Sequence, residues 1–325
     1  MDSMETLQAA LKPFQDQMRA RSLVYAPGDG YWYHRPALDF PPRSVRDPAD
    51  YGVGERLSLA ITQTTLKPAQ QKALVREWCT LLPTLDKVRT LWFHTKVTQE
   101  MFEAACAMPN LEGLYIKWSA ISSLAPIAGL KRLAHLHLGG APSATHIEAL
   151  AQLPALVSLD VTNVRAAGDL RFLQGLPKLR ELWVGGDSNS LKPLLIESLA
   201  PLAALRELEL LTLTTVRLAD GSLAPLAELP RLTHLGLANM FPMEEYAWLA
   251  GRRPDIQCDR FEPSYGPNES LRCKACGQHS LFALTGKGKP WLCQHCDAAR
   301  LALHDAGFRA LVKAAAAGQF GGPGI

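Results

Sequence analysis

The sequence lacks the features that would place it in or across a membrane. None of its hydrophobic stretches approaches the roughly 20 uninterrupted apolar residues that a spanning helix requires. Its start, Met-Asp-Ser-Met-Glu-Thr, is acidic and has neither the basic nor the apolar region of a secretion signal. The charge excess is also small, at +3 for the whole chain, so the protein as a whole is not marked as a polyanion binder.

Motifs of catalysis and disulfide frameworks are missing as well. No G-x-S-x-G, P-loop or H-E-x-x-H motif occurs, and Gly286-Lys-Gly-Lys289 does not have the spacing of a phosphate loop. The seven cysteines are an odd number, and four of them have metal-ligand spacing. We therefore expect a protein that is not an enzyme, in a reducing, cytoplasmic compartment.

What the chain does contain is one short phrase, L-x-x-L-x-L/I/V/F, in seven copies. The spacing between successive copies is 23, 22, 23, 23, 26 and 27 residues. The copies begin at Val88, Leu111, Leu133, Leu156, Leu179, Leu205 and Leu232. The last two apolar residues of each copy are two apart, so both point to one face of a strand, which predicts a stack of parallel strands with a shared interior.

Over about residues 55 to 258 the chain resembles the leucine-rich repeat superfamily, and its shorter returns are similar to those of phosphatase-regulator-like and internalin-like repeats. This resemblance implies an α/β solenoid, with a parallel sheet on the concave face and helices or irregular returns on the convex face. In one respect the sequence departs from the superfamily, which places Asn or Cys three residues after the last strand leucine. Here the position holds Lys96, Ser119, Ala141, Val164, Asp187, Leu213 and Met240. The backbone groups of the inner turns must therefore be satisfied in another way.

Changes in composition divide the chain into five parts. Residues 1–54 are predicted to form an amphipathic helix followed by an irregular cap rich in proline and aromatic residues, and residues 55–258 form the repeats. Residues 259–270 are expected to be a linker, residues 271–297 a zinc ribbon, and residues 298–325 a helix with a tail. Helices are predicted over 68–82, 97–108, 145–153 and 298–317.

Two Cys-x-x-Cys pairs predict a metal site near the end of the chain. Cys273 and Cys276 are separated from Cys293 and Cys296 by sixteen residues, which is typical of a zinc ribbon. Four cysteines fill all four positions of a tetrahedral zinc ion, so the zinc is predicted to be structural. A redox role would need a thioredoxin-like setting that the sequence does not offer. The nearby His279 and His295 are alternative ligands, although surface exposure is expected for both.

The positions that flank the strand leucines predict a partner-binding surface on the concave face. Exposed aromatic residues among mixed charges are typical of the centre of a protein interface. The predicted residues are Trp92, His94, Tyr115, Lys117, His135, His137, Asp160, Trp183, Glu207 and Glu209. The competing interpretation is that the aromatic residues pack against the N-terminal cap or the C-terminal module.

The function predicted on this basis is a protein-protein interaction scaffold or adaptor. Three other readings stay open. His135, His137 and Asp160 are close enough in the predicted sheet to hold a metal or to serve as an acid/base group. The basic ribbon, with Lys287, Lys289 and the aromatic Phe282 and Trp291, has the composition of a nucleic-acid binder. An accessory subunit of an enzyme, such as a phosphatase regulator or a ligase-substrate receptor, rests on analogy within the superfamily.

Overall fold

The structure is a computed structural model that describes residues 41–187, 190 and 192–320 of the 325-residue chain. The predicted helix over residues 1–22 and the cap as far as residue 40 lie outside the described residues. The chain divides into two compact units, with the boundary between Ala166 and Ala167. Each unit is described by itself below.

The first unit is built on five parallel strands, and each strand carries one copy of the repeat phrase or its capping equivalent. Neighbouring strands pair in register, so that Leu91, Leu114, Leu136 and Leu159 lie side by side, each at most 1% exposed. The strands are β1 (Arg56–Leu59), β2 (Thr90–Phe93), β3 (Gly113–Ile116), β4 (His135–Gly139) and β5 (Ser158–Thr162). The prediction that the phrase forms stacked parallel strands with buried leucines is confirmed.

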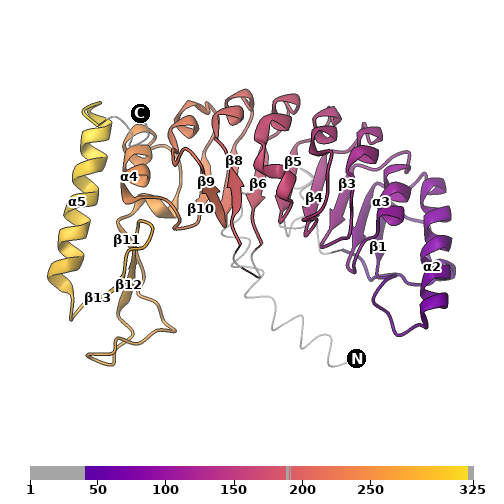
Figure 1. Cartoon of the computed structure of the whole chain (residues 1–325), viewed down its shortest axis with the longest axis horizontal. Coiled ribbons are helices and arrows are strands. Elements are labelled where there is room, and N and C mark those ends of the chain that lie inside the picture. The colour runs from indigo at the N-terminus through magenta and orange to yellow at the C-terminus, as the bar shows by residue number, and fades with distance from the viewer. Residues whose placement is uncertain (1–40, 188–189, 191, 321–325) are drawn as a thin grey trace. The chain divides into compact units, whose positions relative to one another are not determined.

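The returns of the first unit lie on one side of these strands (Figure 1). The first two are α-helices, α2 (Pro68–Leu81) and α3 (Gln99–Cys106), and both were predicted. Thr98 caps the start of helix α3, where its hydroxyl accepts a hydrogen bond from the Met101 amide. The later returns are 3₁₀ turns at Ala125–Gly129 and Ile147–Gln152, and the turn at Arg165–Gly168 contains the boundary with the second unit. The helix predicted over 145–153 is thus a 3₁₀ turn, whose greater rise per residue lets a short return span the repeat.

The described end of the N-terminal cap packs against β1 and α2. Val45 forms a parallel bridge with Leu59, and the Trp78 indole nitrogen of α2 donates a 2.7 Å hydrogen bond to the Arg46 carbonyl. The Tyr51 ring meets Trp78 edge-on at 6.4 Å. Residues 41–51 therefore cover the first strand of the repeat core, as a capping segment must.

The second unit continues the same pattern. Its parallel strands are β6 (Glu181–Gly185), β8 (Leu210–Thr214) and β10 (His234–Leu237), and Gln257 forms a single bridge with His234 as the last rung. A smaller parallel pair, β7 (Leu194–Ile196) and β9 (Val216–Leu218), lies within the returns. The other returns are 3₁₀ turns at Leu170–Gly175, Ala200–Ala204 and Ala224–Glu228, followed by helix α4 (Met243–Arg252).

The register of β8 differs from the prediction. The phrase predicted at Leu205 places Leu208 and Leu210 in the core strand, whereas the structure pairs Leu211 with Leu182 and Leu213 with Val184. The true phrase is therefore Leu208-x-x-Leu211-x-Leu213, and Leu211 and Leu213 are fully buried. The leucines at 208, 210 and 211 fit the repeat phrase in two ways, so the sequence allowed two registers for β8. The additional residues of this repeat are taken up by the return that contains β7.

The C-terminal module completes the second unit. Strands β11 (Ser264–Tyr265), β12 (Leu281–Leu284) and β13 (Trp291–Cys293) form an antiparallel sheet, and helix α5 (Ala298–Ala316) packs against α4 (Figure 1). Residues 259–270, expected to be a linker, thus supply a third strand. Among the described residues, no helix combines the length and apolar character needed to cross a bilayer.

Candidate functional site

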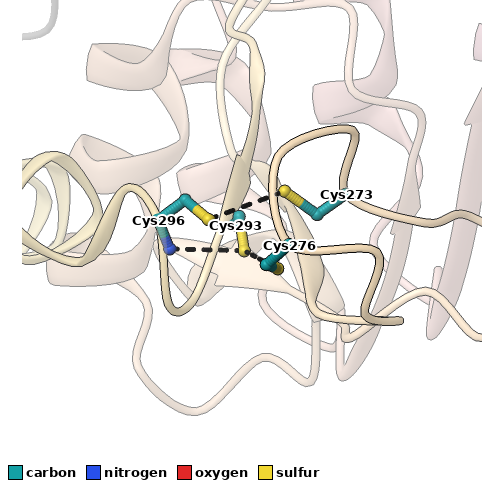
Figure 2. Close-up of side chains that lie close together, drawn as sticks. All are labelled: Cys273, Cys276, Cys293 and Cys296. Carbon is teal, nitrogen blue, oxygen red and sulfur yellow. Dashed lines mark hydrogen bonds between the residues drawn. The ribbon is translucent and has the colours of Figure 1, made fainter.

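The four predicted metal ligands come from two turns of the C-terminal module. Cys273 and Cys276 lie in the loop before β12, Cys293 ends β13, and Cys296 lies just before α5. The first turn is closed by a 2.8 Å hydrogen bond from the Gly277 amide to the Cys273 carbonyl. Gly277 has a φ of +73°, which glycine adopts without strain. Each turn therefore presents two sulfur atoms toward the same point (Figure 2).

The sulfur atoms have the separation that a tetrahedral metal site requires. All four lie within 4.8 Å of one another, with 3.9 Å between Cys273 and Cys296 and 3.7 Å between Cys276 and Cys293. Zinc bound at about 2.3 Å by four thiolates sets its sulfur atoms about 3.8 Å apart, whereas a disulfide needs about 2.05 Å. In the part of the chain that the structure describes, this is the only group of three or more His, Cys, Asp or Glu side chains arranged to hold a metal ion. His279 and His295 are exposed and outside the group.

Hydrogen bonds around Cys293 favour its thiolate form. The Cys296 amide and the Ser280 hydroxyl, at 3.4 and 3.0 Å from the sulfur, lower the pKa of the Cys293 thiol to about 6. By contrast, burial raises the pKa of the Cys79 and Cys258 thiols to about 11. Hydrogen bonding with Cys276 raises the pKa of the Cys296 thiol, in the same cluster, to about 12. The convergence of the four sulfur atoms, and not a shared pKa, therefore separates the cluster from the other cysteines.

Side chains of the last repeat fix the module in place. The Asn239 amide nitrogen donates to the Leu284 carbonyl at 2.8 Å, and its oxygen accepts from the Gly286 amide at 2.7 Å. The Lys287 amide also donates to the Phe241 carbonyl. The turn between β12 and β13 is thus held directly by the repeat core of the second unit.

The predicted partner face forms a continuous row across the first unit. Trp92, Tyr115, His137 and Asp160 are paired neighbours on β2 to β5, as the repeat phrase predicted. The His137 ring stacks on Tyr115 with 4.4 Å between ring centroids, and its Nδ1 atom lies 2.8 Å from an Asp160 carboxylate oxygen. The Thr162 hydroxyl donates to the same carboxylate.

Burial divides the predicted partner residues into two groups. Trp92, Tyr115, His137 and Asp160 are at most 9% exposed. Their burial gives no support to a use as exposed anchors, and their role in binding stays a prediction. The accessible members are Lys117, which is exposed, and the half-buried His94, His135, Trp183, Glu207 and Glu209. Burial, followed by the neighbouring Lys117, lowers the pKa of His94.

The two predicted glutamates of the second unit do not lie in the strand rows. Because β8 takes the later register, Leu210 and Thr212 pair with Glu181 and Trp183, in the places predicted for Glu207 and Glu209. Both glutamates precede the strand. Glu209 forms an ion pair with Arg180, with 2.9 Å between Oε1 of Glu209 and Nε of Arg180, and Glu207 forms an ion pair with Arg231.

Sequence reasoning missed two aromatic contacts on the surface. Lys96 lies over the Trp118 ring, with 5.7 Å from its Nζ atom to the ring centroid. In the C-terminal module, Tyr265 of the supposed linker meets Trp291 edge-on at 6.3 Å. Lys96 follows β2 and Trp118 follows β3, so their similar positions on successive repeats were the signal for the first contact. The second contact depends on β11, which no pattern in the sequence indicated.

The repeated phrase, its parallel register and its helical or 3₁₀ returns define the class of protein: an α/β leucine-rich-repeat solenoid, followed by a small module whose four-cysteine cluster is compatible with a metal ion. No family model matches the sequence, and no curated protein matches it.

Among solved structures, the chain is similar to internalin C2 of Listeria monocytogenes, with 26% identity over 57% of this chain and 79% of that one and a TM-score of 0.43. Internalin F of the same species is 21% identical over 54% of each chain, with a TM-score of 0.41. A leucine-rich-repeat protein of Leptospira interrogans is 16% identical over 55% of this chain and 50% of that one, with a TM-score of 0.37.

Proposed function

We propose that this protein is a non-catalytic scaffold or adaptor that binds a partner protein on the face of its parallel strands that carries these side-chain rows. The observation that carries the proposal is the register of the repeats, which aligns one side chain from each strand in rows. Such a surface is fixed by the backbone ladder, so little conformational freedom is lost on binding. Trp183, half-buried on β6, is the aromatic side chain of this face best placed to act as an anchor.

The proposal is tested by recovery of partners on the tagged protein. We expect Trp183→Ala to abolish recovery of a specific partner while leaving the thermal unfolding midpoint nearly unchanged. Leu195→Ala is the matched control, because this side chain is 59% exposed on β7, away from the strand face. Equal recovery by wild type and Trp183→Ala, or equal losses in both variants, would reject the strand face as the binding surface.

We further infer that the four-cysteine cluster holds a structural zinc ion in a zinc ribbon. Four thiolates match the preference of zinc, and the separations between the sulfur atoms fit tetrahedral binding. Metal analysis should find one zinc per chain in the wild-type protein and none after Cys276→Ser. Iron in place of zinc, or a disulfide detected by mass spectrometry in freshly purified protein, would contradict this inference.

A second function, binding of single-stranded nucleic acid by the module, is favoured by one observation. Trp291 is 43% exposed and lies beside Tyr265, while Lys287 and Lys289 are exposed on the adjoining turn. Aromatic platforms next to cations are typical of single-strand binders. If this function holds, the affinity for oligothymidylate should fall steeply with salt and with Lys287→Ala plus Lys289→Ala.

A further inference from the structure

The two edges of the five-stranded sheet in the first unit differ in how their charges are paired. At the amino ends of the strands, cations and carboxylates alternate. Arg89 pairs with Glu112 at 2.6 Å and with Glu55 at 3.7 Å, and Arg132 pairs with Glu112 at 2.9 Å. This edge is therefore neutralised by its own residues.

The loops at the carboxyl ends of the same strands contain no acidic residue. Residues 60–67, 94–98, 117–124, 140–147 and 163–168 include no Asp or Glu. They do include Lys96 and Lys117, both exposed. In the described part of the first unit, every lysine or arginine that forms an ion pair lies at the opposite edge, and neither Lys96 nor Lys117 has a carboxylate partner. Their charges are available to a ligand.

An exposed aromatic ring lies beside Lys96 and directly follows Lys117 in the sequence. Trp118 is 39% exposed, and Lys96 covers part of its ring. On the next repeat, Gly140 has a φ of +58°, and a Cβ atom at this position would lie 3.0 Å from the Trp118 Cβ atom. The absence of a side chain at Gly140 lets the base of the tryptophan pack closely against the neighbouring loop.

Hydrogen bonds between successive loops hold this edge in one conformation. The Val97 amide donates to the Trp118 carbonyl at 3.1 Å, and the Ser119 amide donates to the Gly140 carbonyl at 3.0 Å. On the other side, the Thr62 hydroxyl donates to the Lys96 carbonyl at 2.6 Å. These bonds satisfy backbone groups of the turns, in a chain that has no Asn or Cys three residues after its last strand leucines. They also fix the backbone that carries both lysines and the tryptophan, which lowers the entropy lost when a ligand binds.

We propose that this edge, formed by Lys96, Lys117 and Trp118, binds an acidic segment of the partner protein, a proposal that rests on the protein-binding function argued above. Carboxylates of the segment would pair with the two lysines, and one apolar side chain would pack on the exposed part of the indole. A protein segment fits better than a nucleic acid because the edge offers a single aromatic ring, whereas single-strand binders stack successive bases on several.

The test is a direct binding measurement with a fluorescein-labelled decaglutamate peptide and the full-length protein at low salt, read by fluorescence anisotropy. We expect saturable binding that weakens by roughly tenfold in Lys117→Glu and several-fold in Trp118→Ala. Two matched variants should bind as wild type does. Lys178→Glu makes the same charge change at an exposed position of the second unit, and Leu195→Ala removes an exposed apolar side chain outside both proposed binding sites.

Each remaining outcome would overturn the proposal. Absence of binding would do so, as would equal weakening by Lys117→Glu and Lys178→Glu, which would show attraction by net charge alone. Tighter binding of a labelled oligothymidylate, lost in the same two variants, would assign the edge to nucleic acid instead. Failure of the acidic-segment proposal can be told apart from failure of the scaffold function. If only the acidic-segment proposal is wrong, Lys117→Glu would still recover a partner that Trp183→Ala does not.

Discussion

At the scale of single residues, Tyr115 and Trp118 show how neighbouring aromatic side chains serve different purposes. Tyr115 points to the strand face and is 2% exposed, in contact with His137, whereas Trp118 follows the strand and is 39% exposed. The first contributes to packing. The second is available to a ligand.

We therefore predict that Tyr115→Ala lowers the free energy of unfolding by about 3–5 kcal/mol, because it leaves a large cavity in a packed row. Trp118→Ala should lower it by about 1 kcal/mol or less, as is usual for surface positions. Urea denaturation followed by circular dichroism measures both values. Equal losses in the two variants would show that the Tyr115 ring is not packed as described.

At the scale of one strand, the register of β8 decides which leucines hold the repeat together. We predict that Leu211→Ala destabilises the protein by about 2–5 kcal/mol, since Leu211 is fully buried. Glu209→Ala should lose less, about 1 kcal/mol, because the half-buried ion pair with Arg180 is still in contact with solvent. Thermal and urea unfolding of the two variants provides the check. A loss of stability in Leu211→Ala no larger than in Glu209→Ala would favour the register predicted from the sequence over the one in the structure.

The contact between α4 and α5 makes a second prediction at this scale. A Cβ atom at Gly251 would lie 2.4 Å from the Val312 carbonyl oxygen, so the two helices cross where α4 has no side chain. Gly251→Val should force α5 away from α4 and reduce stability by about 1–3 kcal/mol. Proteolysis within residues 298–316 should become faster.

The matched control is Gly307→Ala on α5 itself, where a Cβ atom would meet nothing within 4 Å. Alanine is the better helix former, so this variant should gain about 0.5–1 kcal/mol. If Gly251→Val is as well tolerated as Gly307→Ala, the close crossing of the two helices is wrong.

Both the success and the failures of sequence reasoning belong to this scale. From β2 to β5 a single leucine phrase fits each repeat, so the pairing of Trp92, Tyr115 and His137 could be predicted residue by residue. At β8 the adjacent leucines satisfied two phrases, and only packing selects between them. Strand β11 has two residues, too few for a periodic signal.

The candidate sites divide in the same way. The spacing of the four cysteines was enough to predict their convergence, because two short turns and one hairpin leave few alternatives. Exposure on the strand face could not be predicted in this way. The repeat phrase predicts to which face of the strand a side chain points, but it does not predict what packs against that face.

At the scale of the whole molecule, the solenoid predicts that perturbations stay local, because each repeat is stabilised by its immediate neighbours. The metal cluster offers the sharpest test of this property. Its module is attached to the last repeat through Asn239 and Phe241, within the second unit. Loss of the metal should therefore loosen the module and its attachment, and leave the strands of the first unit unchanged.

Hydrogen exchange followed by mass spectrometry, with and without a zinc chelator, measures this directly. We expect faster exchange over residues 264–297 after chelation, because the proposed zinc ion would supply much of the folding free energy of so small a module. The amides of β2, β3 and β4 should exchange at unchanged rates. Cys276→Ser should reproduce the effect without chelator, and Cys258→Ser, which alters a thiol outside the cluster, should not. Unchanged exchange rates in the module would show that no metal stabilises it. Faster exchange in β2 to β4 would show that the chain unfolds as one cooperative unit rather than repeat by repeat.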